Sequence, residues 1–350
     1  MTSPDAPPLP LQADLVCEGG GVKGIALVGA VTGLARAGYR FPRVAGSSAG
    51  AVVAALVAGL QHAGEPISRL DDLLAALDLR RFRDRSAIGR VPLVGRALAV
   101  LTREGAYEGR YLEQYLTGTL ADLGVRTFGD LRTGEPAPQH AYSLVVTATD
   151  LSRRRQVRLP WDLPTYGVDP DDFPVARAVR ASAAIPLFFR PVRVAGATWV
   201  DGGVLSNFPV DLFDQPQGTP PRWPTFGVRL TARPATAPVT VPVRGAIGLA
   251  LATVETLFTG HDAAYVDAPC TVRRTVFVPT DDVSTVDFSL TRAQVQALYD
   301  AGLASARQFL TTWDVDAYVA ACRSPTAPTA PTAGGRPPPG AQMEQAPSPG

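Results

Sequence analysis

The sequence predicts an α/β fold, a three-layer sandwich with a mainly parallel central sheet. Two observations carry this prediction. Short apolar segments of strand length alternate with longer segments of helix length, and two of the changes from strand to helix pass through glycine-rich turns. Such alternation is typical of sheets whose strands are connected by helices. The chain of 350 residues is long enough to bury a substantial core, and it shows no internal repeat.

The individual elements follow in chain order. A strand at Asp14–Cys17, a tight turn and a helix from Val22 to Gly38 come first, and a glycine is a usual end for a helix. A second strand at 43–46 leads into 49–60, a helix of small apolar residues on all sides, which is typical of burial against a sheet. The later predicted elements are strands at 142–147, 192–200 and 225–230, the second with a hairpin turn at Ala195-Gly196, and an amphipathic helix at 291–313.

The two ends of the chain are rich in proline. We expect residues 1–12 to form a flexible Pro-rich leader, 13–323 one folded domain, and 324–350 a disordered Pro/Ala/Thr-rich tail. The N-terminus lacks the basic start and apolar core of a secretory signal. Apolar stretches such as 49–60 are shorter than the roughly 20 residues that span a bilayer. We therefore expect a cytoplasmic protein that can contact a membrane peripherally.

Charge and cysteine content exclude several classes of protein. The formal net charge is +1, without the basic stripe that nucleic-acid binding requires, so we expect no nucleic-acid partner. Three cysteines lie far apart (Cys17, Cys270 and Cys322), and this odd, sparse set argues against a disulfide framework and suits a reducing cytoplasm. The three histidines show no metal-ligand spacing, so we expect no metal site.

A GxSxG sequence, Gly46-Ser47-Ser48-Ala49-Gly50, lies between the second strand and the small-residue helix. This context is typical of a nucleophile elbow, a turn so sharp that small residues must flank a serine whose hydroxyl projects above the sheet. The N-terminus of the following helix directs amide groups and its positive dipole end toward an anion formed there. Alone, the motif can equally be a glycine and serine cap of the helix.

A second glycine-rich turn, GGGVKG at residues 19–24, lies between the first strand and helix. Consecutive glycines leave amide groups free to converge on a developing oxyanion, and each such donor contributes about 3 kcal/mol of transition-state stabilisation. The same residues satisfy the GxGxxG dinucleotide fingerprint, which expects an acidic residue about 20 positions later. No acidic residue occurs between residues 18 and 65. The nucleotide-binding interpretation loses its main support, and we expect no cofactor.

The third motif is Asp201-Gly202-Gly203, directly after the predicted strand at 192–200. An aspartate at a strand end, followed by two glycines, can approach another residue closely. Taken alone, the same three residues are also compatible with a simple turn. The motif becomes specific only beside the other two.

Together and in this order, the three motifs resemble those of the patatin-like phospholipases. That family combines a GGGxKG or GGGxRG oxyanion loop with a GxSxG serine and a DGG or DGA aspartate. The similarity extends from about Asp14 to Leu212, with a weaker likeness through the C-terminal helix. Further similar segments are ATDL at 148–151, ASAAIP at 181–186, FRPV at 189–192 and NFP at 207–209.

By position, the resemblance implies a role for each motif residue. Ser48 becomes the nucleophile and Asp201 its base, in a Ser-Asp dyad that works through an acyl-serine and requires no metal. The oxyanion hole is expected from Gly19, Gly20, Gly21 and Val22, and the motif glycines are Gly24, Gly46, Gly50, Gly202 and Gly203. Residues 13–323 become the patatin-like acyl hydrolase domain.

A histidine-based triad is the main alternative to the dyad. A carboxylate has an ordinary pKa of about 3.9 and is a weak base in water, so a dyad depends more on oxyanion donors and on a desolvated site. Of the three histidines, only His261 satisfies the α/β-hydrolase order of serine, acid and histidine. Its context predicts a solvated helix residue, and His62 is expected at the surface, closing the helix at 49–60.

An arginine-rich segment lies within the predicted domain. Residues 80–103 contain seven arginines and a single aspartate, with apolar residues interspersed. This composition suits a lid or an interfacial segment attracted to anionic lipid. A solvated loop covering the active site is an equal alternative.

These observations predict a lipid acyl hydrolase, like a phospholipase A or lysophospholipase, with phospholipids or other fatty-acyl esters as substrates. Two alternatives stay open. One is a general carboxylesterase or thioesterase acting on soluble acyl groups, and the other is a non-catalytic regulatory module that keeps the fold.

Overall fold

The computed structural model describes residues 11–78, 81, 105–216, 219, 221–231, 243, 245–260, 267–280, 283–285 and 289–323. The strands are β1 (Leu11–Gln12), β2 (Asp14–Cys17), β3 (Tyr39–Arg40), β4 (Val44–Ser47), β5 (Gly105–Tyr107), β6 (Leu144–Asp150), β7 (Arg155–Leu159), β8 (Leu187–Phe189), β9 (Val192–Val194), β10 (Ala197–Asp201), β11 (Thr225–Arg229) and β12 (Thr275–Phe277). The α-helices are α1 (Gly24–Arg36), α2 (Ala49–His62), α3 (Leu70–Ala76), α5 (Arg110–Asp122), α6 (Val175–Ser182), α7 (Gly245–Gly260), α9 (Pro269–Arg273), α10 (Arg292–Thr312) and α11 (Val315–Cys322). Short 3-10 turns complete them: η1 (Gly21–Lys23), η2 (Ile67–Arg69), η5 (Phe128–Leu131), η6 (Leu163–Tyr166) and η7 (Gly202–Val204).

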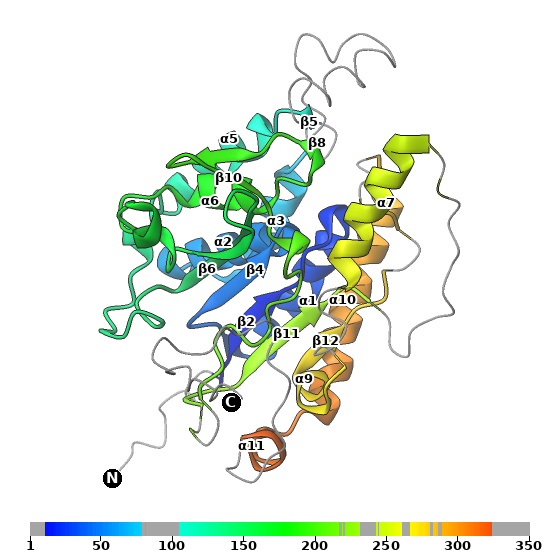
Figure 1. Ribbon diagram of the computed structural model, residues 1–350. Coiled ribbons are helices and arrows are strands. Elements are labelled where there is room, and N and C mark those ends of the chain that lie inside the picture. Colours follow the sequence, from blue (N-terminus) through cyan, green and yellow to red (C-terminus); the bar gives the residue numbers. More distant parts are fainter. Residues whose placement is uncertain are drawn as a thin grey trace, which may run out of the picture.

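A single large sheet organises the described residues, with helices packed around it (Figure 1). Its strand order is β12-β11-β2-β4-β6-β10-β9, and β7 pairs with β6 outside this path. Neighbouring strands from β12 to β6 run parallel, whereas β7, β9 and β10 are antiparallel to their neighbours. The expected α/β class with a mainly parallel central sheet is confirmed.

Side chains on the central strands alternate between two apolar clusters. On β2, Leu15 and Cys17 belong to the main core, which also contains the buried faces of α1 and α2. Val16 lies between them in sequence and joins a smaller cluster with Ala45 and Phe213. Because successive residues of a strand point to opposite faces, the sheet is covered on both sides, and the larger core lies on the side of the helices that follow the two glycine-rich turns.

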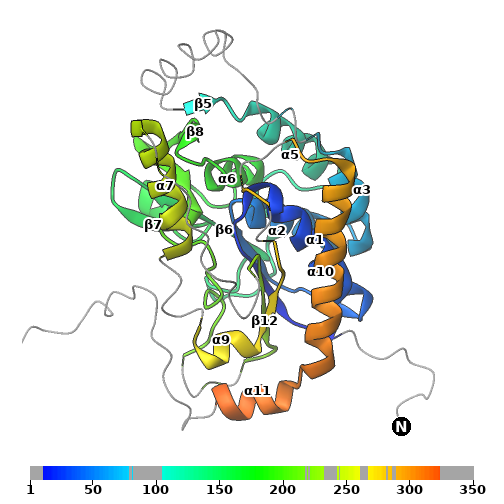
Figure 2. The ribbon, with the colours of Figure 1, turned by 90° about the vertical axis from the view of Figure 1, so that its right-hand side faces the viewer.

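Helix α10 lies alongside α1 and completes this side of the core (Figure 2). Glycines make the close approach possible: a Cβ on Gly29 would lie 2.0 Å from the carbonyl oxygen of Tyr299, and one on Gly302 would lie 2.1 Å from that of Ala26. Helix α10 confirms the amphipathic helix predicted at 291–313, and it packs closely on α1.

Most elements predicted from the sequence occur within a few residues of the expected bounds. The segment at 192–200 is the expected hairpin of β9 and β10, with positive φ at Ala195 (45°) and Gly196 (79°) in its turn. Leu11 and Gln12, assigned to the flexible leader, instead pair with Tyr39 and Arg40 as β1 and β3. The arginine-rich segment 80–103 (apart from Arg81), His261 and the tail 324–350 lie outside the described residues.

None of the helices in the described part of the chain combines the length and the apolar character that a membrane-spanning helix requires.

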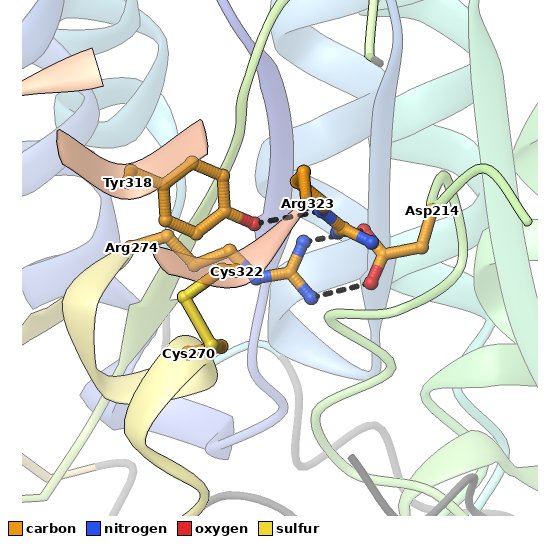
Figure 3. The surroundings of a disulfide bond; sticks show 6 residues. All are labelled: Asp214, Cys270, Arg274, Tyr318, Cys322 and Arg323. Atoms are coloured by element: carbon orange, nitrogen blue, oxygen red, sulfur yellow. Dashed lines mark hydrogen bonds and ion pairs between the residues drawn. A yellow bond between two sulfur atoms is a disulfide. The ribbon is translucent and has the colours of Figure 1, made fainter. Parts of the chain in front are cut away.

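The argument from the sequence against disulfides is wrong for one pair of cysteines. Cys270 of α9 and Cys322 of α11 form a disulfide although they lie 52 residues apart (Figure 3). Cys17 is free and buried. The odd count and wide spacing of the cysteines gave no sign of this pair, because the pair depends on the packing of α9 against α11. That packing brings the two Cα atoms to a distance of 5.6 Å. The argument for a reducing cytoplasm from cysteine content no longer holds.

Ion pairs surround this disulfide. The two guanidinium nitrogens Nη1 and Nη2 of buried Arg274 donate to both carboxylate oxygens of Asp214, which also pairs with Arg323 (Figure 3). The Tyr318 hydroxyl accepts a hydrogen bond from Arg323 Nε at 3.2 Å. The disulfide and this network together tie the last described helix to the edge of the sheet next to β12.

Removing the disulfide is expected to destabilise the protein. A crosslink that closes a loop of this length contributes up to about 4 kcal/mol through the entropy of the unfolded chain. We expect the double variant Cys270→Ser/Cys322→Ser to melt at a lower temperature than the wild type, measured by thermal denaturation without reductant. Dithiothreitol should lower the melting temperature of the wild type and of a Cys17→Ala control, but not that of the double variant. A wild type that melts identically with and without reductant would contradict the disulfide.

Candidate active site

The predicted nucleophile elbow is formed by the end of β4 and the start of α2. Ser48 lies between them with a φ of 51°, a conformation that is rare for a residue with a side chain. Glycine is required on both sides of Ser48, because a side chain would collide with the neighbouring backbone. A Cβ on Gly46 would lie 2.3 Å from the Gly50 carbonyl, and one on Gly50 would lie 2.3 Å from the carbonyl oxygen of Cys17. The sharp turn is thus packed directly against the end of β2.

The register along β6 brings Asp201 to this elbow. Ser47 of β4 pairs with Thr147, and Asp201 of antiparallel β10 pairs with the next residue, Ala148. Strand β7 pairs with residues 146–150 of β6, which include partners of both β4 and β10. It therefore lies on the opposite edge of β6 from these two strands. Strands β4 and β10 therefore share one edge of β6 and meet with their carboxyl ends facing each other.

A short hydrogen bond joins the two predicted catalytic residues. Ser48 Oγ donates to Asp201 Oδ2 at 2.7 Å, and the Gly203 amide donates to Oδ1 at 2.8 Å. Asp201 is fully buried and Ser48 is only 4% exposed. Burial raises the pKa of Asp201 to about 7, although both hydrogen bonds favour the ionised form and limit the shift. A carboxylate with this pKa is a far better base near neutral pH than one in water.

The glycine loop lies next to the elbow and is held by Asn207. The Gly19 amide donates to the backbone carbonyl of Asn207 at 2.9 Å, and the Asn207 side-chain amide donates to the Gly19 carbonyl at 3.0 Å. A Cβ on Gly19 would lie 3.1 Å from the Ser48 Cβ, so this position contacts the nucleophile directly. Asn207 therefore connects the loop to the segment that carries Asp201.

The four residues predicted for the oxyanion hole separate into two pairs. The amides of Gly19 and Val22 are already engaged, the second with the carbonyl of Thr285 at 3.1 Å. Within the described part of the chain, the amides of Gly20 and Gly21 donate no hydrogen bond. Among the described residues, the predicted oxyanion-hole amides without an acceptor are thus those of the central two glycines.

An apolar pocket of about 90 Å³ opens at the elbow. Ser48 and Gly21 lie in its lining, and its walls come from α1, α2, α3 and α5 through residues such as Val52, Leu56 and Tyr115. Leu56 follows Ser48 by eight residues along α2, about 12 Å farther along the helix axis. The pocket therefore offers an apolar chain a path that begins at the nucleophile.

The described histidines do not reach the elbow. His140 lies with Pro42 and Arg43 at the amino-terminal end of β4, whereas Ser48 follows its carboxyl end. Its ring nitrogen Nε2 is 3.1 Å from the Gln215 side-chain nitrogen, and burial lowers its pKa. His62 ends α2, far along the helix from Ser48. Neither can complete a triad with Ser48 and Asp201.

Two contributing residues, Asn207 and Ser182, received no individual role from the sequence. Ser182 Oγ accepts a hydrogen bond from the Ser48 amide at 2.8 Å. Both residues lie in segments that resemble the family, NFP at 207–209 and ASAAIP at 181–186. The resemblance indicated the segments, but only the contacts identify the residues.

Comparison with known proteins identifies the family. A family model described as patatin-like phospholipase matches residues 15–214. Protein YqhO of Bacillus subtilis is 39% identical over 308 residues, which cover 87% of this chain and 99% of YqhO. A protein of invertebrate iridescent virus 6 named "Probable lipid hydrolase 463L" is 32% identical over 69 residues, 20% of this chain and 22% of that protein.

The comparison of structures agrees at the level of the fold. The crystal structure of VipD from Legionella pneumophila matches with a TM-score of 0.51 at 19% identity, covering 87% of this chain and 67% of VipD. The family match spans more than half of the chain and includes all three motifs, from the glycine loop to Asp201. The resemblance drawn from the motifs is confirmed: this chain belongs to the patatin-like phospholipase family.

Proposed function

We propose that this protein is a lipid acyl hydrolase of the phospholipase A or lysophospholipase kind that cleaves carboxylic esters through a dyad of Ser48 and Asp201. The description of its family as patatin-like phospholipase supports lipid ester hydrolysis, and the dyad and the substrate class are our inference. One observation carries it: the Ser48 hydroxyl donates a 2.7 Å hydrogen bond to a buried carboxylate at the mouth of an apolar pocket.

The proposed reaction has two acyl-transfer steps. Ser48 Oγ attacks the ester carbonyl carbon as its proton passes to Asp201 Oδ2, and the Gly20 and Gly21 amides donate to the oxyanion. The alcohol departs with the proton from Asp201 and leaves an acyl-serine. Asp201 then takes a proton from water, the resulting attack releases the fatty acid, and the proton returns to Ser48.

The pocket favours acyl lipids over small soluble esters. Each methylene buried in an apolar environment contributes roughly 0.8 kcal/mol, so walls of aliphatic and aromatic side chains select for a fatty chain. A polar head group would remain outside. Peripheral contact with anionic membrane through residues 80–103 stays a prediction from the sequence.

The first prediction concerns the dyad. Ser48→Ala and Asp201→Asn should each lower kcat by about a thousandfold or more, because the nucleophile or its base is lost. The measurement uses p-nitrophenyl butyrate and vesicles of phosphatidylcholine and phosphatidylglycerol, with EDTA present. Fatty acid released from vesicles supports the lipid hydrolase, whereas turnover of the soluble ester alone would favour the general esterase.

Matched controls distinguish a chemical from a structural loss. Ser47→Ala removes the neighbouring buried hydroxyl, which has no hydrogen-bond partner among the described residues, and should retain activity. Because burial raises the pKa of Asp201 to about 7, ionisation of this carboxyl lowers the stability of the fold progressively as pH rises from about 4 to 7. Above pH 7 this loss of stability is complete. Asp201→Asn should therefore melt no lower than wild type at pH 8. Activity retained by Ser48→Ala would overturn the assignment of Ser48, and a folded wild type that hydrolyses no ester would favour a non-catalytic module.

The second prediction concerns pH. Asp201 acts as a base only when ionised, and its pKa of about 7 leaves most molecules protonated below that value. We expect kcat/KM for a neutral ester to rise about tenfold per pH unit up to roughly pH 7 and then level off. His140→Gln should give the same profile, since His140 lies away from Ser48. A wild-type profile that is flat down to pH 5 would contradict a base with a raised pKa.

The third prediction concerns chain length. Leu56→Phe places a bulkier side chain in the pocket lining, about two helical turns beyond Ser48. It should lower kcat/KM for p-nitrophenyl decanoate at least fivefold relative to the butyrate, roughly the effect of excluding one or two methylenes. Val57→Ile, on the same helix but outside the pocket lining, is the control. Equal effects on both esters would show that the acyl chain binds elsewhere.

A further inference from the structure

One short segment contacts both members of the dyad. At the end of α6, Ser182 Oγ accepts a hydrogen bond from the Ser48 amide at 2.8 Å. Two residues later, the carbonyl of Ala184 accepts one from the Asp201 amide at 3.0 Å. Ser182 and Ala184 are both fully buried. The backbones that carry the nucleophile and the base are thus fixed to the same three residues.

The contact at Ser48 falls where the backbone conformation is least favourable. The φ of 51° keeps Ser48 in the left-handed region, which persists in a residue with a side chain only when its surroundings enforce it. Without Ser182, the Ser48 amide would be a buried donor with no acceptor. Relaxation of this turn would move Ser48 Oγ relative to the Asp201 carboxylate.

The last turn of α6 is itself anchored. Buried Arg180 donates through Nη2 to the carbonyls of Glu108 and Arg190, at 2.6 and 2.8 Å. These acceptors lie directly after β5 and β8, which pair with each other. Ser182 therefore has a fixed support and does not simply follow the elbow.

We propose that Ser182 is a positioning residue for the reaction, which rests on the proposed function. Its hydroxyl holds the Ser48 amide so that Ser48 Oγ stays within hydrogen-bond distance of Asp201, while the Ala184 carbonyl fixes the base from the same segment. Ser182 contacts neither reacting atom. Its effect is on the alignment of the dyad, and therefore on kcat and not on the binding of the ester.

The test compares Ser182→Ala, Ser182→Thr and Ser47→Ala, using kcat and KM for p-nitrophenyl butyrate per folded molecule. A displacement of about 1 Å costs up to a hundredfold in rate, so Ser182→Ala should lower kcat about 10- to 100-fold and leave KM within about twofold. Ser182→Thr keeps a hydroxyl and should recover most of the rate. Ser47→Ala deletes a hydroxyl that has no partner among the described residues and should stay within about twofold of wild type.

A second readout does not depend on activity. Hydrogen–deuterium exchange in a peptide that contains Ser48 should accelerate in Ser182→Ala and not in Ser47→Ala, because only the first variant removes the acceptor of the Ser48 amide.

Each contrary result has its own meaning. If Ser182→Ala keeps wild-type kcat, or raises KM alone, or leaves the exchange unchanged, the positioning role is wrong. A loss of rate equal to the loss of folded protein also overturns it. Failure of the proposed function looks different: the wild type itself hydrolyses no ester. If exchange still accelerates in that case, Ser182 orders the elbow and has no part in ester hydrolysis.

Discussion

The geometry of the site depends on the pairing of two adjacent residues of β6. Thr147 pairs with the end of β4 and Ala148 with the end of β10, so a parallel and an antiparallel strand meet on one edge. A shift of either strand by one residue would turn its side chains to the other face and separate Ser48 from Asp201. The glycines after Asp201 keep this meeting point open, since a Cβ on Gly202 would lie 2.5 Å from the Thr147 carbonyl oxygen.

Two features of the site oppose folding, and the rest of the molecule compensates for them. Ser48 has an unfavourable φ, and burial of Asp201 disfavours its charge at neutral pH. The elbow is constrained by α2, which packs against β2 and β4, and by the hydroxyl of Ser182. The same desolvation raises the pKa of Asp201 to about 7, which suits the proposed role of this carboxylate as a base without a histidine.

Local features were predictable from the sequence, and contacts between distant segments were not. The strands, the elbow and the hairpin at Ala195-Gly196 are encoded in short patterns of apolar residues and glycines, and the motif resemblance added Ser48 and Asp201. The Cys270–Cys322 disulfide, the support from Ser182 and the engaged amide of Val22 each join segments more than 50 residues apart. No spacing rule anticipates them, because they depend on how helices and loops pack around the finished sheet.

The central claim is that Ser48 is the activated nucleophile, and covalent labelling tests it most directly. The protein is treated with a fluorophosphonate at several pH values, digested, and examined by mass spectrometry. We expect a single adduct on Ser48, formed faster as pH rises toward about 7 because the pKa of Asp201 is raised to about 7. An adduct on another residue, or a folded wild type that acquires none at any pH, would contradict it.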